Sequence, residues 1–248
     1  MIIYQLIFSG DPIPDELKPF FLIDVHALLN SLNRNNQIVY KDNVVSFTAG
    51  KVYIFISCPG EEVISNGLNI YAKQWISNIE EDYSLKLSIE KIGEHPEELN
   101  GNYSEASAYI LYGNSYLPLR SLDNFDPIPL YKFPYTYSDN ASYYDINMWH
   151  SNYDNVYAIW DRGDINEPYF KELLSSIESQ LTVDGIEICN RIKQLTNKDC
   201  YFYLFNYDND VPDACPSCGG AWKLENRILD KFDFKCDKCK ILSNLGVD

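Results

Sequence analysis

The chain has 248 residues, 46% hydrophobic and 15% aromatic, so it carries enough apolar material for packed cores and is not a mainly disordered chain. Acidic residues outnumber basic ones by 36 to 20, which gives a formal net charge of -16 at pH 7. Because Lys and Arg supply much of the affinity for phosphates, this charge disfavours nucleic acid as a partner and favours basic proteins. Plain solubility is the alternative explanation of the charge.

The first 93 residues predict a single α+β unit. The expected elements are strands over residues 2–8, 37–47, 51–58 and 84–92, and helices over residues 14–32 and 68–79. Pro19 interrupts the first helical pattern, so the regular helix is expected to begin near it. This order matches the split βαβ, ferredoxin-like arrangement.

No stretch approaches the ~18 consecutive apolar residues that a membrane helix needs. The apolar run Ile2–Phe8 has no basic residue before it and no small-residue cleavage site, so it predicts a strand rather than a signal peptide. We expect a cytoplasmic protein without membrane contacts. Thiols stay reduced there, so Cys-x-x-Cys pairs are expected to bind metal rather than form disulfides.

A polar linker over residues 93–102 leads to a second α+β unit, expected over residues 103–210. Its predicted elements are a hairpin over residues 108–120, long loops and short strands over 126–161, helices over 166–181 and 183–195, and a strand over 200–207. Asn166 is the expected N-cap of the first of these helices.

Four of the seven cysteines stand in the last 34 residues, as CPSC and, 17 residues later, CDKC. Two such knuckles can close a tetrahedral Zn²⁺ site; the expected ligands are Cys215, Cys218, Cys236 and Cys239. Four protein ligands leave no open coordination position, so one structural zinc ion is expected. Residues 211–248 are therefore predicted to form a zinc ribbon. The alternative, four free thiols, would leave this segment with almost no core.

The predicted ribbon has little charge with which to bind nucleic acid. From Cys215 onward there are six basic and five acidic residues. Because four thiolates and one Zn²⁺ together add about two negative charges, the filled ribbon is close to neutral. Only Lys235, Lys238 and Lys240 form a small basic patch, so the charge of the predicted ribbon disfavours nucleic acid as a partner.

The stretch from Ser142 to Asp161 interleaves tyrosines and tryptophans with aspartates. Aromatic side chains supply large contact areas at interface hot spots, and the acidic neighbours suit a basic protein surface. The candidate partner-binding residues are Tyr143, Tyr144, Asp145, Trp149, Tyr153 and Asp154. The alternative is that about half of the aromatic residues, such as Tyr157 and Trp160, are ordinary core.

The sequence predicts no catalytic site. His26, His95 and His150 are scattered, and no Gly-rich phosphate loop, nucleophile elbow or HExxH motif is present. Cys58, before Pro59-Gly60, could serve as a thiol nucleophile, but a core cysteine at a strand end is the favoured interpretation. We therefore expect a protein that is not an enzyme.

The tail CPSCGGAWKLENRILDKFDFKCDKCKILSN resembles an uncharacterised bacterial family of zinc-ribbon-containing proteins with a suggested nucleic-acid-binding role. PLRSLDNFDPIPLYKFP and EICNRIKQLTNKDCYFYLFNY upstream also resemble it. The resemblance implies that the four C-terminal cysteines bind zinc. Because its nucleic-acid role is itself inferred from the ribbon, it adds little to that hypothesis.

The first hypothesis for function is an immunity protein that binds a cognate antibacterial toxin and occludes its active site. The heavy negative charge, the lack of a catalytic set and the Asn/Ile/Lys/Tyr-rich composition favour this role. Toxin domains that act on nucleic acids are often basic, so an acidic inhibitor with aromatic anchors is complementary to them. The second hypothesis is a nucleic-acid-binding accessory protein, and a thiol enzyme built on Cys58 is a third.

Overall fold

The structure is a computed structural model. It describes residues 1–39, 43–48, 50–94, 106–137, 142–208 and 213–246. The chain divides into two compact units: residues 1–100 with 129–133 form unit 1, and residues 101–128 with 134–248 form unit 2. Among the described helices, none combines the length and the apolar character needed to cross a membrane. The predicted boundaries at residues 103 and 211 lie outside the described residues.

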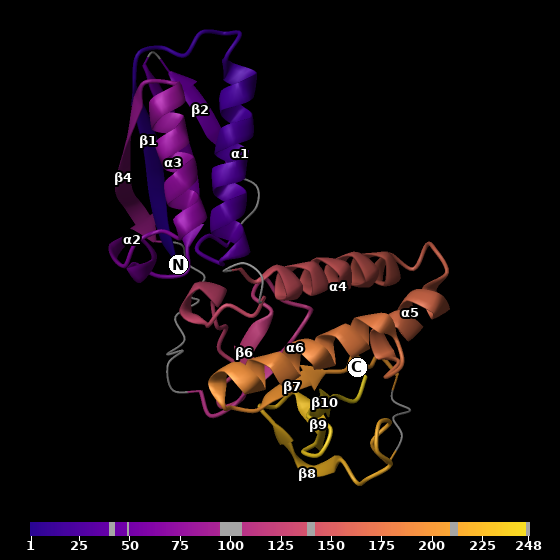
Figure 1. The fold of residues 1–248 in the computed structure, drawn as a ribbon. Helices are drawn as coiled ribbons and strands as arrows, with labels where there is room; N and C mark the ends of the chain where they lie inside the picture. Colours follow the sequence, from indigo (N-terminus) through magenta and orange to yellow (C-terminus); the bar gives the residue numbers. More distant parts are fainter. Residues whose placement is uncertain (40–42, 49, 95–105, 138–141, 209–212, 247–248) are drawn as a thin grey trace. The chain divides into compact units, whose positions relative to one another are not determined.

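Unit 1 is built from a four-stranded sheet and two long helices (Figure 1). Its elements are β1 (Ile2–Gly10), α1 (Lys18–Arg34), β2 (Val45–Thr48), β3 (Lys51–Cys58), α2 (Glu62–Ser65), α3 (Ile70–Asp82) and β4 (Leu85–Glu94). α1 starts later than the apolar pattern alone predicts, with Pro19 in its first turn, where a missing N–H costs no hydrogen bond. β2 is shorter than the strand predicted over residues 37–47, of which residues 40–42 lie outside the description.

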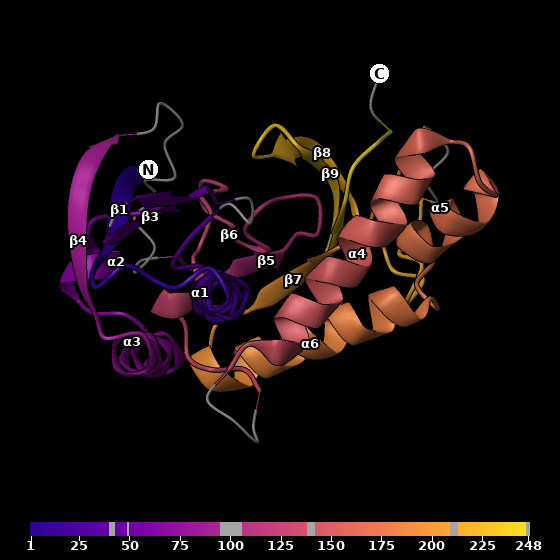
Figure 2. The same ribbon diagram turned by 90° about the horizontal axis from the view of Figure 1, so that it is seen from above.

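The strands of unit 1 are all antiparallel, in the order β2-β3-β1-β4. Leu6 in β1 lies opposite both Ile54 and Ile89, so one face of the sheet is apolar across three strands. α1 and α3 lie side by side on that face (Figures 1 and 2), and their apolar residues join it in one hydrophobic core. Phe21 of α1 is fully buried and meets the ring of Phe8 edge-to-face.

A short segment from later in the chain belongs to unit 1. The 3₁₀ turn Leu130–Lys132 packs beside the α1 end, where the Tyr131 N–H donates to Asn35 O at 2.8 Å. The Tyr131 hydroxyl and the Lys132 ammonium both contact the carboxylate of Glu62, at 2.9 and 2.5 Å. These polar contacts fix the segment to α2 and to the end of α1.

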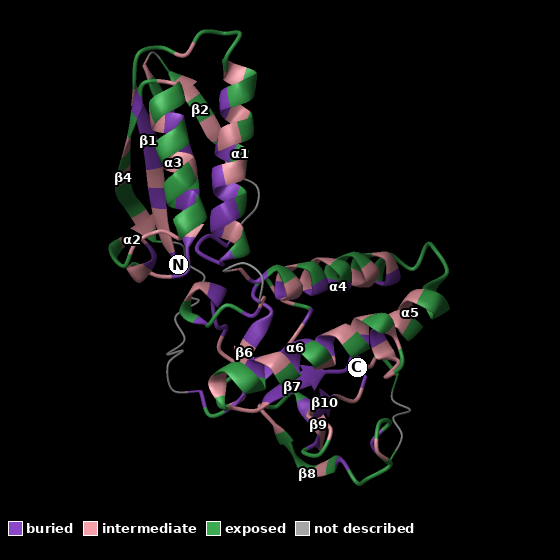
Figure 3. Cartoon of the chain, in the orientation of Figure 1, coloured by how far each residue is buried: buried purple, intermediate pink, exposed green. Residues whose placement is uncertain are grey.

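Unit 2 combines a six-stranded mixed sheet with three helices. Its elements are β5 (Tyr109–Leu111), β6 (Leu119–Ser121), α4 (Tyr144–Arg162), α5 (Glu167–Ser175), α6 (Gln180–Thr196), β7 (Cys200–Tyr203), β8 (Lys223–Ile228), β9 (Phe232–Cys236) and β10 (Ile241–Ser243). The strand order is β6-β5-β7-β10-β9-β8, with parallel pairs β5–β7 and β7–β10. Buried residues gather on the central strands (Figure 3). The predicted α+β class is confirmed, with two sheets.

Residues 144–162 form a 19-residue helix, so the loops and short strands predicted over residues 126–161 are wrong for this part. The buried residues Ile146, Trp149, Tyr153 and Trp160 follow one another at intervals of three, four and seven, which is helical spacing. Gly163 closes the helix at φ +68°, a left-handed C-cap. The aromatic stretch is therefore the core-facing side of an amphipathic helix.

Candidate metal centre

Two loops of the predicted C-terminal ribbon bring the four predicted cysteine ligands together. Cys215 and Cys218 precede β8, Cys236 ends β9, and Cys239 lies in the turn between β9 and β10. Their sulfur atoms all lie within 4.8 Å of one another, and the Sγ atoms of Cys218 and Cys236 are 3.7 Å apart. Four sulfur donors at these separations are compatible with a metal ion held by protein ligands alone.

The backbone explains why each Cys-x-x-Cys pair turns its sulfurs inward. In the first pair, the Gly219 N–H donates to Cys215 O at 2.8 Å, and the Cys215 N–H donates to Gly220 O at 2.7 Å. Gly219 follows the second cysteine at φ +69°, and Lys240 holds the same position after Cys239 at φ +56°. In both knuckles the residue after the second cysteine is therefore left-handed, although only the first places glycine there, where this conformation is least costly.

The thiols do not share one electrostatic environment. The Gly220 backbone N–H and neighbouring thiols lower the pKa of Cys218 to about 7, whereas burial raises the pKa of Cys239 to about 12. Cys215 and Cys236 are buried. Four adjacent thiolates would repel one another strongly without a cation, and a soft divalent metal removes that conflict. The donor set therefore suits a structural metal ion.

The ribbon is continuous with the main sheet of unit 2. β10 begins two residues after Cys239 and pairs with β9 on one side and β7 on the other. The Trp222 ring packs on Phe234 at 4.9 Å between centroids, and Phe232 meets Tyr203 of β7 at 5.8 Å. The segment that carries the four cysteines thus shares both hydrogen bonds and aromatic packing with the rest of the unit.

The predicted basic patch of the ribbon is largely neutralised by ion pairs. Lys235 contacts Asp237 at 2.9 Å, and Lys240 contacts Asp199 at 2.7 Å. Both ammonium groups also lie over the Tyr201 ring, at 5.0 and 5.2 Å from its centroid. Both ammonium groups are therefore already engaged by side chains of the protein itself.

Of the six candidate partner-binding residues, three lie in the core, so their prediction as exposed contacts is wrong. Tyr143, Trp149 and Tyr153 are buried, because α4 turns this side toward the sheet and α6. Trp149, for example, packs on Phe202 of β7, and its Nε1 donates to Leu181 O at 2.8 Å. Because so little of their surface is exposed, none of these three rings projects from the surface as an interface anchor.

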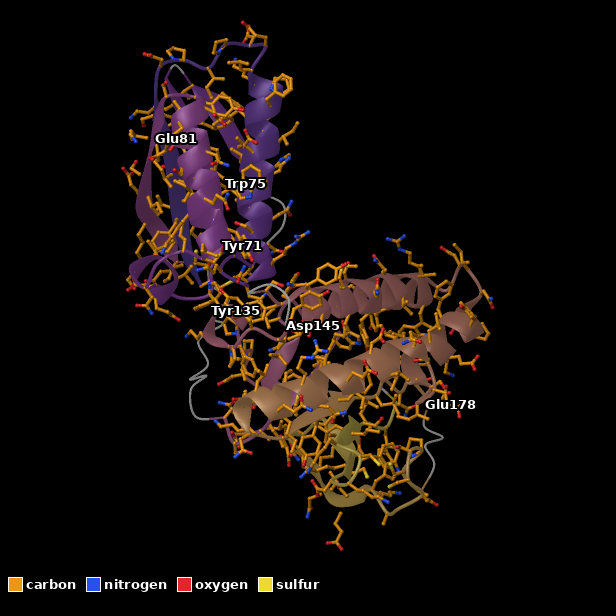
Figure 4. All side chains as sticks on the ribbon, viewed as in Figure 1. Tyr71, Trp75, Glu81, Tyr135, Asp145 and Glu178 are labelled. Atoms are coloured by element: carbon orange, nitrogen blue, oxygen red, sulfur yellow. The ribbon has the colours of Figure 1, made fainter. Side chains whose placement is uncertain are left out.

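The other three candidates have different environments. Tyr144 is 51% exposed. Asp145, at the start of α4 (Figure 4), accepts from Thr136 Oγ1 at 2.6 Å and from Arg191 at 3.1 Å. Asp154 is half-exposed beside His150, one turn earlier on the helix. Tyr144 and Asp154 are therefore accessible, whereas Asp145 has a structural role in joining α4 to α6.

The Cys58 thiol lacks the environment of a nucleophile. It is fully buried at the end of β3, and burial, followed by the charge of Glu62, raises its pKa to about 12. The reactive form of cysteine is the thiolate, so this side chain is protonated at neutral pH. Cys189 and Cys200 are also buried, with their sulfurs 3.5 Å apart, as expected for core cysteines.

Comparisons with known proteins place the chain among uncharacterised relatives. Residues 103–205 match a family described as a domain of unknown function (DUF2310), and residues 208–248 match another (DUF8594). An uncharacterised protein of Haemophilus influenzae is 31% identical over 143 residues, which are 56% of this chain and 70% of that protein. The chain therefore belongs to the same uncharacterised bacterial family as that H. influenzae protein. A second uncharacterised H. influenzae protein in the comparison is also 31% identical, and the chain spans about half of it, 54%.

One solved structure has a distant structural likeness to part of this chain. It is a Deinococcus radiodurans protein named for antibiotic biosynthesis monooxygenases, 14% identical, with a TM-score of 0.29. The likeness covers 39% of this chain and 97% of that one.

Proposed function

We propose that the four cysteines bind one Zn²⁺ ion and that this ion is structural. Four thiolates fill a tetrahedral zinc site and leave no position for a substrate or a catalytic water. The centre would join the loop before β8 to the end of β9 and to the turn before β10. The purified protein should contain one zinc per chain, and Cys236→Ser should reduce that content markedly. Equal zinc content in both proteins would contradict the assignment.

Unit 1 is, in our proposal, a ferredoxin-like unit. Its strands and long helices follow the order βαββαβ, and its antiparallel sheet runs β4-β1-β3-β2, which supports this class. The one-turn helix α2 is an addition between β3 and α3. The class says nothing about activity, because such folds carry many functions.

We further propose a non-enzymatic binding protein whose partner is a basic protein. The observation that carries this proposal is that basic side chains of the predicted ribbon already contact acidic or aromatic groups of the same protein. Beside the two lysines over Tyr201, Arg227 pairs with Asp233 through two nitrogens, and Lys231 lies over the Phe125 ring at 5.0 Å. In a chain of net charge -16, little cationic surface then remains on the ribbon for phosphates.

The most specific form of this proposal is a cytoplasmic immunity protein that occludes the active site of a cognate antibacterial toxin. Acidic charge accelerates encounter with a basic toxin domain and opposes wrong partners. The test is co-expression with the product of the neighbouring gene. Cells that stop growing when that product is made alone should grow when this chain is made with it. Continued growth arrest, with the chain present in soluble form, would contradict the immunity role.

The alternative is a nucleic-acid-binding accessory protein, which the four-cysteine ribbon by itself would suit. Lys238 supports this alternative, because it stands in the second knuckle without an ion pair among the described contacts. Electrophoretic shift of DNA and RNA near physiological salt distinguishes the two proposals. We expect no shift at micromolar protein; a shift that Lys238→Ala weakens would favour the alternative.

A further inference from the structure

A groove of about 240 Å³ lies between α4 and α6, within unit 2. Residues from both helices line it: Asp145, Met148, Trp149, Asn152, Asp184, Glu187, Ile188 and Arg191. Trp149 and Ile188 are buried and supply an apolar floor, whereas Met148 is 43% exposed on the wall. The groove therefore offers apolar contact below and polar groups along its rim.

The distance between the two helices is fixed at the floor of this groove. The Trp149 Nε1–H donates to the carbonyl of Leu181, at the start of α6. Gly185, one turn further, has no side chain to separate the helices, since a Cβ there would lie 3.0 Å from Trp149 Nε1. The floor is thus formed without a partner, which lowers the entropic cost of binding.

The rim carries two negative charges that no cation of the groove offsets. Arg191 is the only basic residue among the described lining residues, and it is engaged by Asp145 at 3.1 Å. Asp184 accepts a hydrogen bond from the neutral amide of Gln180 at 2.7 Å, and Glu187 is exposed. Both carboxylates project from α6, one turn apart, so a cation in the groove would meet both.

We propose that this groove binds an arginine side chain of a basic partner protein; the inference rests on the proposed function in taking that partner to be basic. A guanidinium presents five N–H donors in a plane and can contact two carboxylates at once, and its aliphatic stem can pack on Met148. The volume is below the ~300 Å³ at which small-molecule pockets begin, so it suits single side chains.

Other occupants fit the same observations less well. The two uncompensated carboxylates would repel a phosphate or an acidic peptide. A second copy of this chain, with its net charge of -16, would likewise be repelled at long range. An arginine from a basic protein satisfies both the charge of the rim and the apolar floor.

A rhodamine-labelled hexa-arginine peptide is the probe, and its fluorescence anisotropy is measured with the full chain at physiological salt. The test variant is Asp184→Asn with Glu187→Gln. The matched control is Glu172→Gln with Glu178→Gln, which removes two exposed charges from the same unit, outside the groove (Figure 4 labels Glu178). Because exposed ion pairs contribute up to ~1 kcal/mol each, the test variant should raise the Kd about tenfold and the control less than about twofold. Equal losses in both variants would overturn the proposal.

The Trp149 indole N–H gives an independent readout in NMR spectra, since it lies at the floor of the groove. Its resonance, assigned with Trp149→Phe, should shift when the peptide is added to the native chain, and no shift would overturn the proposal. Neither assay needs a toxin. If the groove variant loses the peptide but the native chain fails to protect cells, only the immunity role is refuted. If the chain protects cells while both variants bind the peptide equally, only the groove is refuted.

Discussion

Ile241 of β10 lies in parallel register with Phe202 of β7, and this pairing joins the four-cysteine segment to the sheet of unit 2. The Phe202 N–H donates to Lys240 O at 2.8 Å, at the residue directly after the proposed ligand Cys239. Ile241 also pairs with Cys236, the last residue of β9. One short strand therefore connects two of the proposed metal ligands to the centre of the sheet, so metal binding and sheet stability should be coupled.

Gly185, the one glycine of α6, is predicted to tolerate no side chain. A Cβ at this position would lie 2.2 Å from the Phe202 ring, so the helix or the ring must move. Gly185→Ala should lower the free energy of unfolding by about 1–3 kcal/mol, the usual cost of overpacking a core. Urea denaturation of the full chain measures this.

Gly163→Asn serves as the control for that measurement. Gly163 caps α4 in a left-handed conformation, an added Cβ would meet no atom within 4 Å, and Asn tolerates this conformation. As a surface substitution in a conformation that Asn tolerates, the control should change stability by less than about 0.5 kcal/mol. If Gly185→Ala were as mild as the control, the close packing of α6 on β7 would be refuted.

Cys58 should resist alkylation in the native protein. Its thiol is fully buried, and burial raises its pKa to about 12, so almost no thiolate exists at pH 7. Iodoacetamide should leave it unmodified at pH 7 and modify it after unfolding in urea, as read by mass spectrometry of tryptic peptides. Native labelling as fast as that of free cysteine would restore the thiol-enzyme hypothesis.

Glu62 should make the attachment of residues 130–132 dependent on pH. Burial alone would raise the pKa of Glu62, but hydrogen bonds from Lys132, from the Glu62 backbone and from Tyr131 hold it below its usual value. A lowered folded-state pKa stabilises the fold above the unfolded value of about 4.3, and this contribution is lost as the pH falls through the folded value.

Hydrogen exchange at the Tyr131 amide, which donates to Asn35 O, measures the Glu62 contribution. Glu62→Gln should reduce its protection factor about two- to fivefold at pH 7, the range for a partly exposed ion pair, and should have a smaller effect at pH 3. Glu90→Gln, at an exposed position of β4, is the matched control. An equal effect of Glu62→Gln at both pH values would contradict the assigned role.

Sequence spacing predicted the cysteine cluster correctly because ligand geometry is local: each Cys-x-x-Cys turn fixes its own two sulfurs. The order of elements in unit 1 was likewise predicted from simple apolar periodicities. α4 was missed because its buried face is made of Tyr and Trp, which the sequence argument assigned to an interface. Trp149 and Tyr153 in fact hold core positions of a helix.

The pairing of β10 with β7 could not be read from the sequence either. β10 has three residues, Ile241–Ser243, which is too short for a period to be recognised. Its place is decided by contacts with β7, whose strand ends about 40 residues earlier in the chain. Such non-local pairings leave no local pattern, so the ribbon's integration into unit 2 became visible only in the structure.

The central claim is that the four-cysteine centre is structural and completes the sheet of unit 2. Thermal unfolding of the protein before and after verified removal of zinc by a chelator tests it most directly. We predict that zinc removal lowers the melting temperature, and that Cys236→Ser has the same effect without a chelator. An unchanged melting temperature, with zinc loss confirmed by metal analysis, would contradict the claim.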